Sequence, residues 1–170
     1  MKALRTDNSQ KEYYLTDVIE IMKEKKLPVY ACQAPDYQET QGVNTREDLA
    51  KVTKIICSRV NQRLMHSGVT LIDPVSIYID ATVEIKPDTL IYPGTIIQGK
   101  TTIGSNCRIG PNILIMDSKI EEGVVVKYSE VIRSSVAPKA EIIHSVVVGS
   151  KIRKGEKIPP FSNISKSRMT

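Results

Sequence analysis

Few residues of this 170-residue chain could carry acid–base chemistry. Acyl transfer needs a base that deprotonates the acceptor, and the base is usually a histidine. Of the two histidines, His144 is the candidate catalytic residue, because its place in Ile143-His144-Ser145 predicts an outward side chain. His66 stands at the expected end of a helix, which favours a surface or capping role. The pair Glu121-Glu122 indicates a solvated bend rather than a general acid/base pair.

Patterns typical of metal and phosphate sites are missing from the sequence. The three cysteines, Cys32, Cys57 and Cys107, are far apart, and no C-x-x-C pair or Cys/His cluster accompanies them. We expect them to be reduced and buried. A phosphate-binding loop needs glycines that let the backbone wrap the phosphates, yet no glycine precedes Gly42. A nucleotide site built from this chain alone is therefore not expected.

Composition and charge narrow the range of partners. Hydrophobic residues make up 41% of the chain and charged residues 25%, enough apolar residues for a buried core. The net charge is +5, but aromatic residues are only 5% and tryptophan is absent, so stacking surfaces for nucleic acid are scarce. Much of the excess charge lies near the end, where we expect a solvated tail: Lys151, Arg153, Lys154, Lys157, Lys166 and Arg168. No apolar run could span a membrane, and the polar start lacks a secretory signal, so we expect a cytoplasmic protein.

The elements that would position His144 are predicted by a six-residue repeat. Isoleucine occupies seven consecutive positions of one frame: Ile79, Ile85, Ile91, Ile97, Ile103, Ile109 and Ile115. Four positions after the isoleucines, the residues are small or β-branched. Three positions after several of the isoleucines stands Asp, Gly or Asn, residues that suit tight corners. The phase slips by one between Ile115 and Ile120. We expect the inward column to continue through Val126, Ile132, Val136, Ile142 and Val148.

This period predicts a β-helix. Each six-residue unit supplies a short strand and a corner, three units make one triangular turn, and one turn cannot bury its own isoleucines without neighbours. An antiparallel sheet would show a period of two instead. We therefore expect a mostly β fold, a parallel β-helix of hexapeptide repeats over residues 68–160. The left hand is the one found in families with such repeats and does not follow from the spacing.

The first part of the chain has a different pattern. Thr16 and the following acids predict a short helix that ends in lysines, and residues 28–33 are apolar enough for a strand. Asn44 or Thr45 is expected to cap a longer helix over residues 46–67 with a face of Leu49, Val52, Ile56, Val60 and Leu64. The expected order is an α/β segment (1–45), a linking helix (46–67), the β-helix (68–160) and a polar tail (161–170).

Four motifs carry a resemblance to a known family. They are Glu12-Tyr13-Tyr14-Leu15-Thr16-Asp17, Gly42-Val43-Asn44-Thr45-Arg46, Gly68-Val69-Thr70-Leu71-Ile72-Asp73-Pro74, and the pair Ile91-Tyr92-Pro93-Gly94-Thr95 with Ile109-Gly110-Pro111-Asn112. With these motifs in this order, the chain resembles the bacterial bifunctional N-acetylglucosamine-1-phosphate uridyltransferases/glucosamine-1-phosphate acetyltransferases. Residues 1–45 would match the C-terminal edge of the uridyltransferase domain, a nucleotidyltransferase-like α/β domain. The later motifs would match the first coils of the β-helix.

The resemblance implies magnesium-dependent uridyl transfer from UTP to N-acetylglucosamine 1-phosphate, a step of amino-sugar nucleotide and cell-wall biosynthesis. Of that site only Asn44 has a counterpart here, as a ligand of magnesium and of the sugar nucleotide. The glycine-rich loop would lie before residue 1, and residues 146–150 have no counterpart of the arginine in the acetyltransferase site. We therefore expect a partial chain, truncated or a split partner, that binds UTP or a sugar nucleotide only with an upstream domain.

A non-catalytic trimeric scaffold, or an acyltransferase-like binding module, is the alternative. The outward residues Leu90, Ile96 and Leu114 share one position of the repeat and predict an apolar stripe that self-association would bury. The resemblance also implies a homotrimer. Packing of these residues under the helix over 46–66 is the other interpretation of the stripe.

Overall fold

The computed structural model describes residues 14–165, and the chain divides into two compact units, Met1–Gln41 and Gly42–Thr170. In the described part of the first unit, helix α1 (Asp17–Glu24) and the 3-10 helix η1 (Tyr37–Thr40) are the regular elements. The helix predicted after Thr16 is confirmed. The strand expected over residues 28–33 is absent: these residues are exposed, and no described strand of this unit lies beside them to supply hydrogen bonds.

The second unit begins with the long helix α2 (Arg46–His66), which confirms the predicted linking helix. Thr45 is its N-cap, and Thr45 and Asp48 form a capping box. Only the C-terminal part of the helix is buried, through Val60, Asn61 and Leu64. The Asn61 side-chain amide fixes this end, because it donates hydrogen bonds to the carbonyl oxygens of Pro74 (2.9 Å) and Ile77 (3.1 Å).

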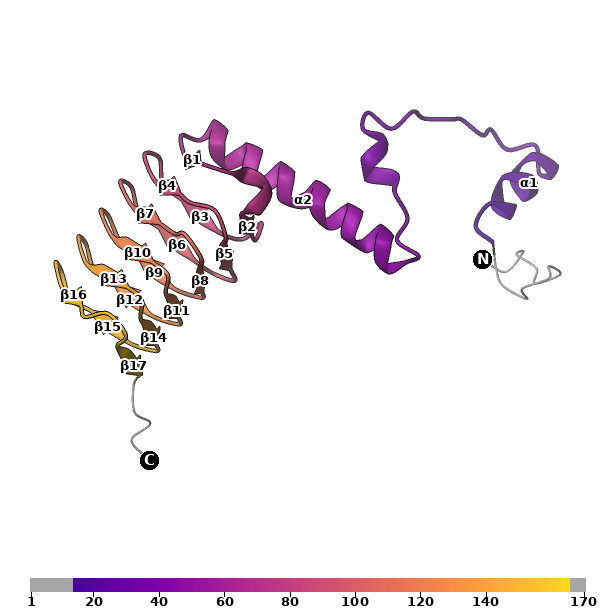
Figure 1. Ribbon diagram of the computed structural model, residues 1–170. Helices are drawn as coiled ribbons and strands as arrows, with labels where there is room; N and C mark the ends of the chain where they lie inside the picture. Colours follow the sequence, from indigo (N-terminus) through magenta and orange to yellow (C-terminus); the bar gives the residue numbers. More distant parts are fainter. Residues whose placement is uncertain (1–13, 166–170) are drawn as a thin grey trace. The chain divides into compact units, whose positions relative to one another are not determined.

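A left-handed parallel β-helix follows α2 (Figure 1), and the 3-10 helix η2 (Pro74–Ser76) lies inside its first coil. Three parallel sheets form its walls. Sheet A contains β1 (Thr70–Leu71), β4 (Leu90–Ile91), β7 (Arg108–Ile109), β10 (Val125–Lys127), β13 (Glu141–Ile143) and β16 (Lys157–Ile158). Sheet B contains β2 (Tyr78–Ile79), β5 (Thr95–Gln98), β8 (Ile113–Met116), β11 (Glu130–Ile132), β14 (Val146–Val148) and β17 (Asn163–Ser165). Sheet C contains β3 (Glu84–Ile85), β6 (Thr102–Ile103), β9 (Lys119–Ile120), β12 (Ser135–Val136) and β15 (Lys151–Ile152).

The repeat in the sequence corresponds to the core. Each of the seven isoleucines of the regular column is buried, and parallel pairing places Ile79, Ile97 and Ile115 above one another in sheet B. The last strand, β17, falls in the region expected to be a polar tail, and it pairs with β14. Lys151 and Lys157 likewise lie in strands β15 and β16, facing outward.

Beyond Ile115 the coils become shorter, and two predicted core positions are wrong. Register pairs Ile115 with Val131 and Val131 with Val147, so these coils contain 16 residues, whereas the coils that join Ile79, Ile97 and Ile115 contain 18. Val131 and Val147 are fully buried, whereas Ile132 and Val148 are partly exposed. Val126, Val136 and Ile142 are buried as predicted.

The shorter corners depend on serine. In the six-residue unit the Thr101 hydroxyl donates to the carbonyl oxygen three residues back (2.6 Å). Ser118 donates instead to the carbonyl oxygen two residues back (2.7 Å), which closes the corner with one residue fewer. The backbone N–H of Ser134 then donates to the Ser118 oxygen, and that of Ser150 to the Ser134 oxygen, each at 3.1 Å. This ladder satisfies buried polar groups along the edge between sheets B and C.

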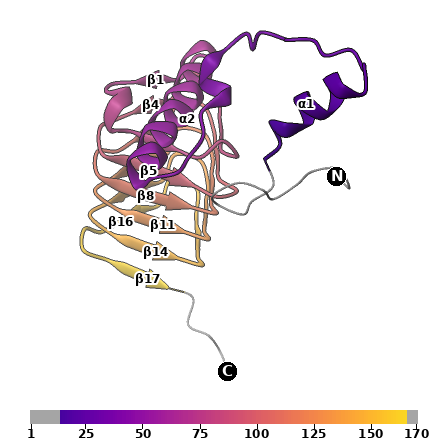
Figure 2. The ribbon, with the colours of Figure 1, turned by 90° about the vertical axis from the view of Figure 1, so that its right-hand side faces the viewer.

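The predicted apolar stripe lies on sheet B, but Leu90 is not part of it. Ile96 pairs with Leu114 in sheet B, whereas Leu90 pairs with Arg108 in sheet A. Figure 2 shows the strands of sheet B in one column. Helix α2 packs mainly against β1, η2 and β2 and not against the strands β4, β5 and β8 that carry Leu90, Ile96 and Leu114, and Ile96 remains 39% exposed. The interpretation of these residues as packed under the helix is therefore wrong.

Candidate functional site: an aromatic groove beside sheet B

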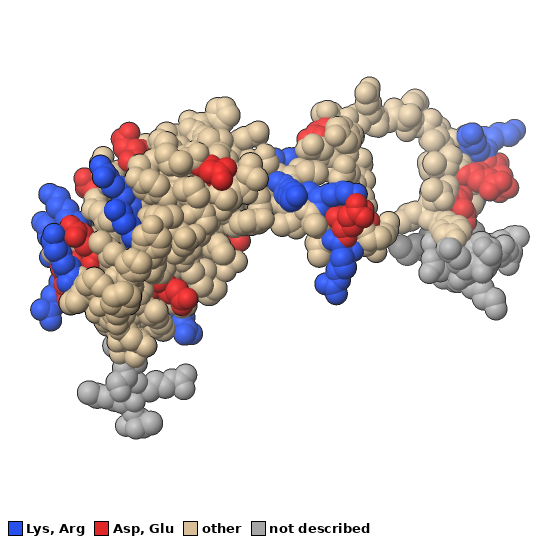
Figure 3. Space-filling model, in the orientation of Figure 1, with Lys and Arg blue, Asp and Glu red and all other residues tan. Residues whose placement is uncertain are grey.

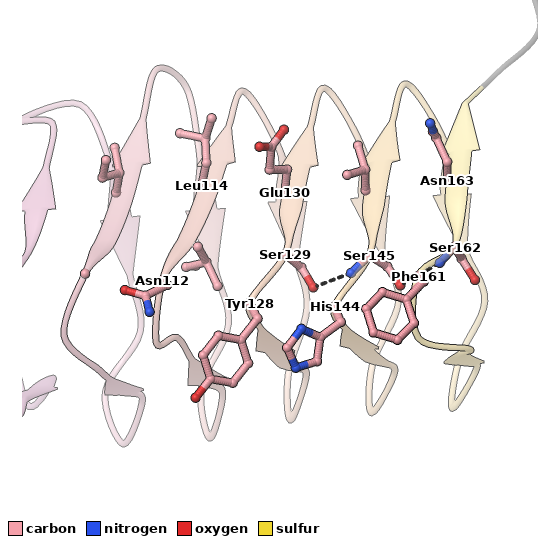
Figure 4. Close-up of a pocket in the computed structure, with 14 residues that line it drawn as sticks. Asn112, Leu114, Tyr128, Ser129, Glu130, His144, Ser145, Phe161, Ser162 and Asn163 are labelled. Atoms are coloured by element: carbon pink, nitrogen blue, oxygen red, sulfur yellow. Dashed lines mark hydrogen bonds between the residues drawn. The ribbon is translucent and has the colours of Figure 1, made fainter.

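His144 lies in an open groove of about 670 Å³ at the edge between sheets A and B. One wall consists of Tyr128, His144 and Phe161, which occupy the same corner of three successive coils (Figure 4). The other wall consists of outward residues of sheet B, including Leu114, Glu130, Val146 and Asn163. We call this the aromatic groove.

The three rings of the aromatic groove stack along the helix axis. The ring centroids of Tyr128 and His144 are 4.7 Å apart with an interplanar angle of 9°, and those of His144 and Phe161 are 5.7 Å apart at 31°. These spacings follow from the coil repeat, because neighbouring parallel strands lie about 4.8 Å apart.

Each ring is attached to a left-handed backbone position. The φ angles are +50° at Tyr128, +50° at His144 and +63° at Phe161, a region that costs a bulky residue about 1–2 kcal/mol. Gly94 and Asn112, which tolerate this conformation, occupy the same corner in earlier coils. Two stacking contacts of about 0.5–1.5 kcal/mol each do not offset three such costs. Stability of the single chain therefore does not explain why aromatic residues stand here.

The backbone of His144 is fixed, whereas its imidazole is held only by stacking. The His144 N–H donates to the Lys127 carbonyl oxygen (3.0 Å), and the His144 carbonyl oxygen accepts from the Phe161 N–H (2.7 Å). Within residues 14–165 no hydrogen bond to either ring nitrogen is present. A catalytic histidine is normally oriented by a third group. The groove thus presents His144 outward, as the sequence predicts, without a described partner that would orient it as a base.

Asn44 lies in the exposed segment before α2 and is not among the residues that line the aromatic groove. Its nearest carboxylate is that of Asp48, 3.4 Å from the Asn44 backbone nitrogen. Hydrogen bonds from the Thr45 hydroxyl (2.8 Å) and the Thr45 N–H (3.0 Å) occupy this carboxylate and lower the pKa of Asp48. No group of three potential metal-binding side chains occurs among the described residues. The residues around Asn44 therefore do not by themselves fit magnesium.

The remaining titratable candidates have structural partners. His66 Nδ1 is 2.7 Å from the Gln62 carbonyl oxygen near the end of α2, and Glu121 forms an ion pair of 2.9 Å with Lys119. Of the cysteines, Cys107 is buried as expected, and burial raises the pKa of its thiol, whereas Cys32 is exposed. No helix in the described part of the chain is long and apolar enough to cross a membrane.

Tyr128 and Phe161 were not predicted as neighbours of His144. The signal was present: Tyr128-Ser129, His144-Ser145 and Phe161-Ser162 repeat an aromatic residue before a corner serine. The three serines form a second ladder, in which Ser145 N–H donates to Ser129 Oγ (3.0 Å) and Ser162 N–H to Ser145 Oγ (3.3 Å).

The repeats and the fold define a hexapeptide-repeat β-helix protein. Residues 82–112 match the family model described as bacterial transferase hexapeptide (six repeats). The chain is 44% identical over 167 residues to the bifunctional protein GlmU of Clostridium novyi, covering 96% of this chain and 36% of that protein. It is 46% identical over 169 residues to the bifunctional protein GlmU of Acetivibrio thermocellus, covering 98% and 37%.

The chain thus spans little more than a third of the length of the curated relatives that it matches. Among solved structures, a perosamine N-acetyltransferase mutant from Caulobacter crescentus overlaps 63% of this chain and 59% of its own, with 14% identity and a TM-score of 0.41. That overlap is too loose to bear on function.

Proposed function

We propose that this chain is the assembly part of a GlmU-like protein of amino-sugar nucleotide biosynthesis, and that its β-helix joins three copies through sheet B. The proposal rests on the outward side chains of that sheet, which are mostly apolar and are interrupted by the polar residues Gln98, Glu130, Asn163 and Ser165. The apolar members are Tyr78, Ile96, Leu114, Met116, Ile132, Val146 and Val148. We call this set the sheet B stripe.

The other two walls differ from sheet B. In register, the outward residues of sheet C are Glu84, Thr102, Lys119, Ser135 and Lys151. Those of sheet A include Arg108, Glu141 and Lys157, the last two joined by an ion pair of 3.1 Å. A patch of apolar side chains concentrated on one wall is typical of a protein–protein interface. Association about a three-fold axis would bury the stripe in a closed assembly.

The aromatic groove supports the same proposal. It runs beside the sheet B stripe and shares Ile96, Leu114 and Val146 with it. Burial of Tyr128 and Phe161, which are 45% and 86% exposed in the single chain, would contribute about 25 cal/mol for each Å² of apolar surface removed from water. Such a contribution would compensate the unfavourable backbone angles of the aromatic residues.

Uridyl transfer and acetyl transfer are not assigned to this chain alone. We propose that Asn44 contacts a sugar nucleotide or its magnesium ion only together with residues that the described part does not supply. A non-catalytic scaffold remains the second candidate, favoured by the absence, within residues 14–165, of a group that orients His144.

The mass in solution tests the proposed assembly. Light scattering coupled to size exclusion, at micromolar chain concentration, should give about 57 kDa, three times the chain mass of 18.9 kDa. A mass near that of one chain would show that the stripe stays exposed and would overturn the proposal. A mass near that of two chains would retain self-association but exclude the three-fold arrangement.

A further inference from the structure

A second groove, of about 350 Å³, lies at the edge between sheets B and C, and cationic side chains surround it. The four cationic residues come from four successive coils: Lys100, Lys119, Arg133 and Lys151. We call it the basic groove. Figure 3 shows lysine and arginine side chains, with some acidic ones among them, over the coils nearest the C-terminus. We propose that the basic groove binds the phosphate chain of a small di- or triphosphate compound.

Strand register arranges the donors at the spacing of the coils. Thr102, Lys119, Ser135 and Lys151 occupy one outward column of sheet C. With about 4.8 Å between neighbouring strands, Lys119 and Lys151 flank the Ser135 hydroxyl on either side. The hydroxyls of Thr102 and Ser135 make no hydrogen bond within residues 14–165, so they are available to phosphate oxygens.

Acidic side chains offset part of this charge, because Asp117 itself lines the basic groove. The Asp117 carboxylate accepts from the backbone N–H of Lys100 (2.9 Å), and Glu121 pairs with Lys119 (2.9 Å). Among the described residues Lys100, Arg133 and Lys151 have no ion-pair partner. Three unpaired cations thus face a groove whose volume suits a small ligand.

Arg133 stands where the backbone would favour a smaller residue. Its φ is +46°, and the same corner of other coils is occupied by Gly99, Asp117 and Gly149. Strain of this kind concentrates at functional sites. Gly149, in the next coil, has no side chain, so the space beside the Arg133 guanidinium is not filled from that corner. A planar guanidinium matches phosphate oxygens in a bidentate fashion.

The dimensions favour a small ligand over nucleic acid. The cations span only the few coils between Lys100 and Lys151, and no aromatic side chain lines the basic groove. Proteins that bind single strands combine a long basic track with aromatic stacking surfaces. The inference does not depend on the proposed assembly, because the basic groove lies on a different edge from the aromatic groove.

Calorimetric titration with inorganic tripolyphosphate at low ionic strength tests the inference. The groove variant is Arg133→Gly with Lys151→Gln, in which glycine suits the positive φ and thermal unfolding verifies the fold. The control is Lys54→Gln with Lys127→Gln, which removes the same charge from α2 and from sheet A. The groove variant should bind about tenfold or more weakly, and the control within about twofold of the wild type. Arg133→Lys keeps the charge but loses the paired donors of the guanidinium. Its affinity for tripolyphosphate should lie between those of the wild type and the groove variant.

Three results would overturn the inference. One is no binding of tripolyphosphate at millimolar concentration. Another is an equal loss of affinity in the groove and control variants, which would indicate diffuse surface charge. The third is tighter binding of a single-stranded oligonucleotide than of tripolyphosphate, lost in the same groove variant, which would assign the groove to nucleic acid.

Discussion

The buried isoleucines decide the stability of single coils. Ile97 and Ile109 have no exposed surface, and Ile103 has 2%. Each belongs to the hydrophobic core formed by inward residues of successive coils. A polar side chain at such a position has no hydrogen-bond partner, and an ionised one is far more costly.

Ile103→Asp should therefore destabilise the chain by about 4 kcal/mol or more, because it places a carboxylate in an apolar bore. Urea unfolding followed by circular dichroism measures the effect. Thr102→Asp is the matched control, since this exposed neighbour on β6 points outward and should change stability by about 0.5 kcal/mol at most. An unchanged unfolding midpoint for Ile103→Asp would show that the register is wrong.

Between strands, the length and hydrogen bonds of each corner determine which residues of the next strand face inward. The six-residue period predicted the core as far as Ile115, because the corners up to that residue keep the phase. Beyond it, adjacent apolar residues such as Val131-Ile132 and Val147-Val148 fit either face, and only the corner length selects one. Ser118 and Ser134 shorten their corners by a hydrogen bond to the residue two positions back, which a count of six does not anticipate.

The neighbours of His144 were not predicted for the same reason, because the corner lengths were not known. His144 could be predicted to point outward from its immediate neighbours. Its stacking between Tyr128 and Phe161 depends on coils of 16 and 17 residues, which residue spacing alone did not reveal. The face to which Leu90 belongs was likewise mistaken, because successive units of the repeat lie on different walls of the prism.

Helix α2 offers a pH-dependent test of its capping box. Hydrogen bonds from Thr45 lower the pKa of Asp48 below its usual value of 3.8. Because the folded pKa is depressed, the stabilisation is present above about pH 4 and is lost as the pH falls through the lower folded value. Hydrogen exchange at the first turn of α2 should accelerate as the pH falls below about 4, after correction for intrinsic rates.

Asp48→Asn should abolish most of this dependence, because the amide does not titrate. Glu47→Gln is the matched control, since Glu47 lies in the same turn and pairs only with Lys51 on the surface. If Asp48→Asn kept the full pH dependence of exchange, another group would be responsible for it.

For the whole molecule, the three walls of the prism have different surfaces. Sheet B is mostly apolar with Glu130 among its outward residues, sheet C carries mainly hydroxyl and cationic side chains, and sheet A is mixed. This division separates the proposed assembly surface from the proposed phosphate site, so that each is open to test without disturbing the other.

The purified chain should not release pyrophosphate from UTP and N-acetylglucosamine 1-phosphate, even with magnesium. The reason is chemical: the sequence has no glycine-rich phosphate loop, and the described residues gather no metal ligands around Asn44. A coupled pyrophosphate assay measures turnover. Release above a buffer blank that Asn44→Ala abolished would contradict the prediction.

Sedimentation velocity of two variants tests most directly whether sheet B is the assembly surface. The first, Ile96→Asp with Leu114→Asp, places charges in the sheet B stripe, and the second, Leu90→Asp, places one on sheet A. The stripe variant should sediment as a single chain, while Leu90→Asp should sediment as three chains, like the wild type. Loss of assembly by Leu90→Asp, with the stripe variant unaffected, would contradict this prediction.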